Sequence, residues 1–78
     1  MISSLLPLLI ASSLLSPTIE RAFDRFESHD LAGAAALLDQ AAASDPEYFD
    51  LNNLYYLRGR IAESLEDWQG AREAFGEI

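Results

Sequence analysis

The chain of 78 residues repeats its own pattern at an interval of 37 residues. Shifting the sequence by that interval places most small residues on small ones and most large apolar residues on large apolar ones. The matching pairs are Arg21 with Arg58, Ala22 with Gly59, Asp30 with Asp67, Leu31 with Trp68, Ala34 with Ala71, Leu38 with Phe75, and Ala41 with Ile78. A period of this length is typical of one supersecondary unit stacked on its neighbours. The sequence therefore predicts two tandem copies of one structural unit.

The first copy has the signals of two helices joined by a short turn. Ser16 followed by Pro17 favours a helix start, because serine caps the N-terminus and proline suits the first turn. Apolar residues then recur at helical spacing until about Ser28. Asp30 can cap a second, alanine-rich helix, whose small side chains let a neighbouring helix approach closely. This helix is expected to stop before Pro46, which cannot continue it.

The second copy has the same organisation. A third helix is predicted from around Phe49 or Leu51 to about Ser64, and a fourth from about Trp68 to the end of the sequence. Gly59 lies inside the third helix, where glycine costs about 1 kcal/mol relative to alanine. We therefore expect it to admit a neighbouring side chain. Strand-like alternation is absent and the sequence has no valine, so the predicted fold class is all-α.

Residues 1–16 form a leucine-rich segment without charged side chains. An apolar centre followed by small residues is typical of a secretory signal, and the same composition suits an ordinary packing helix. A membrane span would need about 20 apolar residues, so we expect no integral span. The apolar stripe of the last helix continues to Ile78 without a cap. This pattern predicts an N-terminal piece of a longer chain, so that further repeats of the same chain are an alternative to a separate protein or peptide as partner.

The charge balance restricts the partners. Thirteen acidic residues face five basic ones, all arginine, for a net charge of −8. Such a chain repels the phosphates of nucleic acids and the head groups of anionic lipids. A basic or apolar surface of a protein or peptide is the better match. A simpler interpretation is that the charge keeps a small helical domain soluble.

The sequence contains no recognisable catalytic or metal-binding constellation. Cysteine is absent and His29 is the single histidine, so a metal site would depend on remote carboxylates. The acidic residues Glu63, Glu66 and Asp67 are expected to lie at a solvated turn, with Asp67 capping a helix. We therefore predict that this segment is not an enzyme and needs no cofactor.

The second copy resembles a tetratricopeptide repeat. Aromatic and small residues of that family are matched here by Tyr55, Gly59, Trp68, Ala71 and Phe75, with Ile78 at a position where the family usually has a small residue. The first copy matches through Ala22, Leu31, Ala34, Leu38, Ala41 and Pro46, but it lacks the early aromatic residue. The interval exceeds the typical ~34 residues of the family, and the extra residues fit in the connection 46–53.

The resemblance implies an α-solenoid of antiparallel helix-turn-helix repeats that acts as a scaffold for protein–protein interaction. Residues 17–45 would form a degenerate repeat, and residues 46–78 a tetratricopeptide-like repeat that lacks its C-terminal continuation. Ligands of the family lie along the first helix of each repeat. The positions that correspond here are Phe23, Glu27, Asn53, Tyr56, Arg60 and Glu63. The family's basic clamp for chaperone tails is built largely on lysine, which this chain lacks.

A narrower resemblance concerns the stretch from Asn53 to Arg60, followed by Asp67 and Trp68. It is similar to the helical N-terminal region of exported soluble lytic transglycosylases, whose catalytic glutamate lies in a separate C-terminal domain. This alternative implies an exported, periplasmic bacterial protein whose catalytic domain is not part of this sequence. A third alternative is a homo-oligomer that buries the open face of the last helix.

Overall fold

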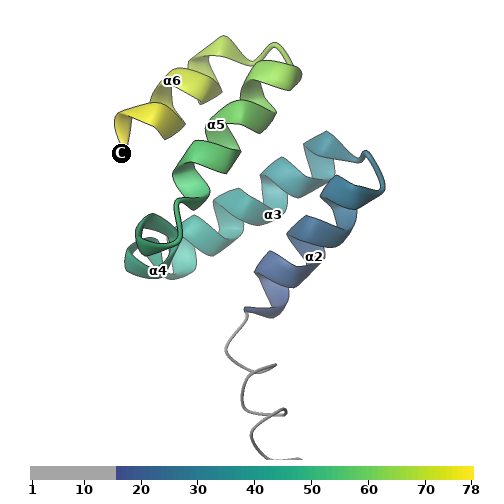
Figure 1. The fold of residues 1–78 in the computed structure, drawn as a ribbon, viewed down its shortest axis with the longest axis vertical. Helices are drawn as coiled ribbons and strands as arrows, with labels where there is room; N and C mark the ends of the chain where they lie inside the picture. Colours follow the sequence, from purple (N-terminus) through teal and green to yellow (C-terminus); the bar gives the residue numbers. More distant parts are fainter. Residues whose placement is uncertain (1–15) are drawn as a thin grey trace, which may run out of the picture.

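The computed structural model describes residues 16–78, which form five α-helices and no strand (Figure 1). The helices are α2 (Pro17–Glu27), α3 (Leu31–Ser44), α4 (Pro46–Leu51), α5 (Leu54–Ser64) and α6 (Trp68–Gly76). The prediction of an all-α fold is confirmed for this range. Of the segment 1–16, whose alternatives were a signal or a packing helix, only Ser16 belongs to the described residues. None of the described helices is long and apolar enough to cross a membrane.

Side-chain caps fix where the helices begin. The Ser16 hydroxyl accepts a hydrogen bond from the Thr18 N–H at 3.2 Å. Asp30 accepts one from the Gly33 N–H at 2.9 Å, and Asp67 accepts one from Gly70 at 3.0 Å. Each bond satisfies a backbone donor that has no partner inside its helix. The predicted caps at Ser16, Asp30 and Asp67 are therefore confirmed.

The connection between the two copies differs from the prediction. Residues Pro46–Leu51 form the separate helix α4, so the predicted start of the third helix at Phe49 or Leu51 is wrong. Asp45 caps α4 through the Tyr48 N–H, and Pro46 occupies its first turn. Asn53 then adopts a left-handed conformation with φ 58°, which asparagine tolerates better than most residues, and α5 begins at Leu54. The last helix also ends earlier than predicted, at Gly76.

The turns inside the two copies have the same backbone geometry. His29 and Glu66, which are 37 positions apart, both have positive φ, at 66° and 58°. The next residue in each copy, Asp30 or Asp67, donates its N–H to the carbonyl five positions earlier, at 2.8 Å in both cases. The repeat seen in the sequence is thus a repeat of turn geometry as well as of residue size.

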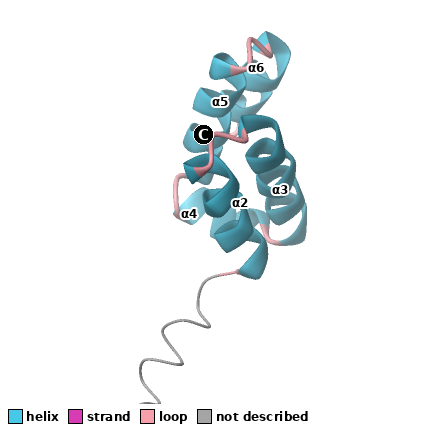
Figure 2. Ribbon diagram, turned by 90° about the vertical axis from the view of Figure 1, so that its right-hand side faces the viewer, coloured by secondary structure: helices cyan, strands magenta, loops and turns pink. Residues whose placement is uncertain are grey.

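The main helices lie side by side in a row. Helix α2 packs on α3, α3 packs on α5, and α5 packs on α6, while α4 contacts α3 and α5. Figures 1 and 2 show the two antiparallel hairpins, α2–α3 and α5–α6, arranged one after the other in this row. Each hairpin therefore depends on its neighbour in the row for cover.

The core runs along the first hairpin and its contact with α5. Its largest fully buried side chains are Leu38, Phe49 and Ile61. Between them lie buried alanines, which allow the close helix contact expected from the sequence. In the second hairpin, a Cβ atom added to Gly59 would overlap the ring of Phe75. The prediction that Gly59 admits a neighbouring side chain is therefore confirmed.

Candidate functional site

Three of the six predicted partner-binding residues gather on the exposed side of α5. Arg60 donates a hydrogen bond from Nη1 to the Tyr56 hydroxyl at 3.1 Å, and its Nε lies 3.0 Å from Glu63 Oε1. The guanidinium carbon also lies 5.9 Å from the centroid of the Tyr56 ring, within range of a cation–π interaction. Hydrogen bonding to Tyr56, together with the charge of Glu63, raises the pKa of Arg60. The cluster is a preorganised cation beside an exposed ring.

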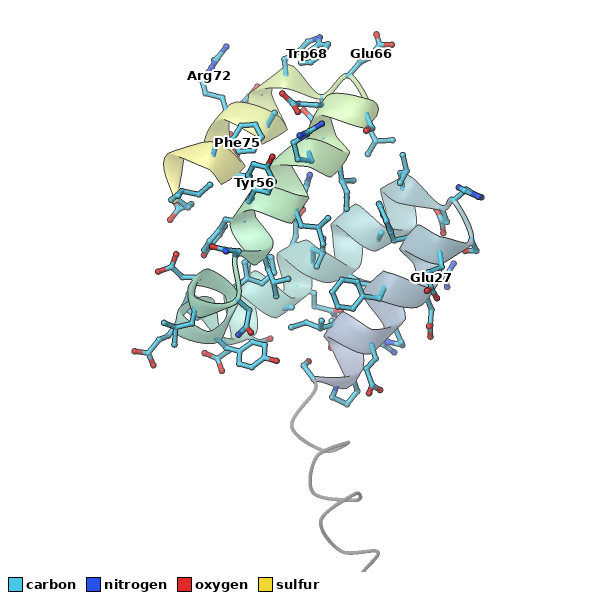
Figure 3. The ribbon with its side chains drawn as sticks, viewed as in Figure 1. Glu27, Tyr56, Glu66, Trp68, Arg72 and Phe75 are labelled. Atoms are coloured by element: carbon cyan, nitrogen blue, oxygen red, sulfur yellow. The ribbon has the colours of Figure 1, made fainter. Side chains whose placement is uncertain are left out.

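Helix α6 contributes two further aromatic residues that the sequence analysis did not place in the site. Phe75 is half-buried, and its ring centroid lies 5.9 Å from that of Tyr56, with the ring planes tilted by 42°. Trp68 begins α6 and is 59 % exposed. Figure 3 shows Tyr56 and Phe75 facing each other between α5 and α6, with Trp68 at the opposite end of α6 from Phe75. We call the neighbouring rings of Tyr56 and Phe75 the aromatic surface.

The sequence analysis did not place Phe75 and Trp68 in the site. It matched both residues to positions in the second helix of a repeat where tetratricopeptide repeats have aromatic residues. The signal that could have identified them is the apolar stripe of α6, which among the described helices packs only on α5. Exposed aromatic residues beside one another mark an interaction surface.

The remaining predicted residues lie elsewhere. Phe23 and Glu27 are exposed on α2, at the other end of the row (Figure 3 labels Glu27). Phe23 is one helical turn from Glu27, and neither residue belongs to a helix that packs against α5. Asn53 is the left-handed residue before α5, and its side chain makes no cap hydrogen bond. The structure thus does not bring the six predicted residues into one cluster.

A pocket of about 260 Å³ lies between α3, α5 and α6. Its lining includes Asp39, Arg58, Glu73 and Glu77. Arg58 donates two hydrogen bonds to the Asp39 carboxylate, at 2.7 and 3.1 Å, which raise its pKa. Because Asp39 belongs to α3 and Arg58 to α5, this pair fastens one hairpin to the other. The pocket accordingly has a structural ion pair, and no nucleophile in its lining is paired with a base.

The other titratable groups are dispersed over the surface. His29 is exposed in the turn between α2 and α3. Within residues 16–78, no three histidine, cysteine, aspartate or glutamate side chains come together in a way that could hold a metal ion. The aromatic surface with Arg60 is therefore the feature of the described residues that most resembles a functional site.

Comparisons with models of protein families, with curated proteins and with solved structures found no match to this chain. The resemblances to tetratricopeptide repeats and to lytic transglycosylases therefore stay predictions.

Proposed function

We propose that this protein is a non-catalytic helical-repeat scaffold that binds another protein or a peptide at the aromatic surface beside Arg60. The observation that supports it most directly is the pair of neighbouring rings, the exposed Tyr56 and the half-buried Phe75, next to a cation that is itself oriented by Glu63. Such rings are costly to leave in water and bury a large area on binding.

The chemistry of this surface suits a protein ligand. Tyrosine, tryptophan and arginine are the residues most enriched among those that dominate binding energy at protein interfaces. Here Tyr56 supplies both an apolar ring and a hydroxyl, and Arg60 supplies donors for a carboxylate or a carbonyl. A segment with an apolar anchor next to an acidic side chain would use both features.

The repeated turn geometry supports the further proposal that the hairpins are arranged as in a tetratricopeptide-like solenoid. In such arrays each unit packs only on its neighbours, and one extended face is left to ligands. The residues of α5 that face solvent, Tyr56, Arg60 and Glu63, would then lie on the ligand face.

The test is capture of the partner by two matched variants of the full chain. A photo-crosslinking amino acid at position 64, which is exposed one helical turn after Arg60, is expected to give a defined protein adduct in the native host. The substitutions Tyr56→Ala and Arg60→Ala together should abolish capture and leave the helical circular dichroism unchanged.

The control variant combines Leu51→Ala with Arg21→Ala, because both side chains are exposed on α4 and α2, away from the proposed site. It should capture the partner as the unmodified chain does. Equal capture by the Tyr56/Arg60 variant and the unmodified chain would reject the proposed surface.

A further inference from the structure

The pocket of about 260 Å³ exists because α3 and α6 do not contact each other. Both helices pack on α5, which lies between them (Figure 1). Helix α5 contributes Tyr55 and Arg58 to the lining, and the remaining sides come from α3, α4 and α6. All of these helices belong to the described residues. The walls of the pocket are therefore present within residues 16–78, and no further repeat is needed to form it.

Small and aromatic residues give the pocket room and apolar surface. The small residues of its lining are Ala42, Gly70 and Ala74. Ala74 stands where α3, 37 positions earlier, has the larger Leu37. The rings of Phe49 and Tyr55, whose centroids lie 4.7 Å apart, add apolar surface. Sites that enclose a whole small ligand usually measure about 300–1,000 Å³. This cavity is smaller, so it suits one long side chain of a larger molecule.

Negative charge remains in the pocket after its cation is paired. Arg58 is the basic residue of the lining, and it is bound to the carboxylate of Asp39. Glu73 and Glu77, one turn apart on α6, form no ion pair with another described residue. The residues 37 positions earlier are the uncharged Ala36 and Gln40. The second hairpin therefore has both the room and the charge to receive a cation.

Arg58 also has a donor that is not used. Its Nε and Nη2 atoms bind Asp39, whereas Nη1 is buried and has no hydrogen-bond partner among the described residues. A buried donor without an acceptor raises the free energy of the folded state. The main-chain carbonyl of a bound peptide is an acceptor of the kind that is missing. This donor therefore favours a ligand that carries a carbonyl as well as a cation.

We infer that the pocket between α3, α5 and α6 binds a lysine residue of a partner peptide, with its ammonium group at Glu73 and Glu77 and its alkyl chain against the aromatic rings of the lining. An ammonium group has three donors that rotate freely, so it can bond two separate carboxylates, whereas the planar fork of arginine matches one. The alkyl chain of lysine packs on apolar surface while its charge stays at the rim. The inference concerns a different site from the proposed function, because Tyr56 and Arg60 do not line this pocket.

The experiment titrates the full, isotope-labelled chain with acetyl-glycyl-lysyl-glycine amide, a peptide whose only charge is that of its lysine. The backbone amide signals of Ala42, Gly70 and Ala74 in nuclear magnetic resonance spectra report on the lining. We expect saturable shifts of these signals. The matched peptide with norleucine, which lacks the charge, should bind about five-fold more weakly, the size of one partly exposed ion pair. No saturable shift with the lysine peptide would overturn the inference.

Two double variants of equal net charge separate the pocket from general attraction to an acidic chain. Glu73→Gln with Glu77→Gln removes the acids of the pocket and should weaken binding of the lysine peptide about five-fold. Glu20→Gln with Asp24→Asn removes two exposed acids that also lie one turn apart, on α2. This control should bind the peptide as the unmodified chain does. Equal weakening in both variants would show non-specific attraction and overturn the inference.

A third variant blocks the pocket without changing the charge. Ala42 is half-buried in the lining, so Ala42→Leu should fill the space and abolish the saturable shifts of Gly70 and Ala74. Circular dichroism checks that the helices are kept, and the glutamine variant serves as the test if they are not. Binding that survives in folded Ala42→Leu would place the peptide outside the pocket. The Tyr56/Arg60 double variant should bind the lysine peptide unchanged, so this inference and the proposed function fail separately.

A free alkylamine is another source of the same cation. Butylamine has the ammonium group and an alkyl chain but no carbonyl, so it should bind more weakly than the lysine peptide. Equal affinity of butylamine and the peptide would assign the pocket to free alkylamines and overturn the assignment to a peptide.

Discussion

The hairpins α2–α3 and α5–α6 share a turn and differ in their surroundings. Both turns have a residue with positive φ followed by an aspartate that caps the next helix. Yet Leu38 of the first hairpin is fully buried, whereas its equivalent in the second, Phe75, is half-buried. The first hairpin is covered by α5, and the second is the last of the described row.

This difference separates features that depend on neighbouring residues in the sequence from features that depend on the packing of one hairpin against the next. Capping and turn geometry depend on residues within one turn of each other, so they recur wherever the short sequence recurs. Burial in a single row of helices depends on the next unit, so it changes at the end of the row. The equivalent position that is core in one hairpin is therefore only half-buried in the other.

The strongest test of this comparison substitutes equivalent core positions. Leu38→Ala should lower the free energy of unfolding by about 2–5 kcal/mol, as expected for a fully buried leucine. Phe75→Ala should cost less, about 1–2 kcal/mol, because the ring is only half-buried and leaves a site open to water. Urea denaturation monitored by circular dichroism measures both. If Phe75→Ala lowered the free energy of unfolding as much as Leu38→Ala does, the smaller burial of Phe75 would be contradicted.

A smaller change in stability is expected at the position where the first hairpin has Ala22 and the second has Gly59. Gly59→Ala alone should not gain the helix propensity of about 1 kcal/mol, because the new methyl group meets the ring of Phe75. With Phe75→Ala already present, the same substitution should stabilise the protein by about 1 kcal/mol. The control is Ala22→Gly at the equivalent position, which should destabilise. Additive effects of Gly59→Ala and Phe75→Ala would disprove the coupling of the two residues.

The predictions that succeeded from sequence concern short-range signals. Ser16, Asp30 and Asp67 were identified as caps because the helix that each one caps follows it directly. The role of Gly59 was identified because glycine inside a helix lowers its stability, so a close packing contact is expected at that position. Helix α4 was missed, since its apolar residues also fit one longer helix and the break depends on the left-handed backbone of Asn53.

The candidate site was harder to predict for a different reason. Tyr56, Arg60 and Glu63 follow helical spacing and could be grouped from sequence alone. Trp68 and Phe75 could not, because the same residue types are core in a covered hairpin and surface in an uncovered one. Whether a neighbour covers them is a tertiary fact that periodicity does not contain. Phe23 and Glu27 were grouped with the others through the repeat, although the row places α2 far from α6.

The smallest predicted effect concerns the turns, where the two copies differ by one ion pair. Arg25 Nη1 lies 3.0 Å from Asp30 Oδ2, whereas the residue equivalent to Arg25 in the second turn is Ala62. The hydrogen bond from the Gly33 N–H, and then the bond from Arg25, lower the pKa of Asp30 below its ordinary value of 3.8. A carboxylate whose pKa is lowered by folding stabilises the folded state above its unfolded pKa, and this contribution is lost as the pH falls through the folded pKa.

Asp30→Asn tests this contribution, because asparagine still caps a helix but carries no charge. At neutral pH the variant should melt at a lower temperature than the unmodified chain. The difference should shrink as the pH falls from about 4 through the lowered pKa of Asp30, since both side chains are then neutral. Asp67→Asn is the matched control, and its melting temperature should drop less at neutral pH because Ala62 stands at the position of Arg25 and Asp67 forms no ion pair with another described residue. A difference for Asp30→Asn that stays constant down to pH 2 would mean that the charge of Asp30 does not distinguish the two turns.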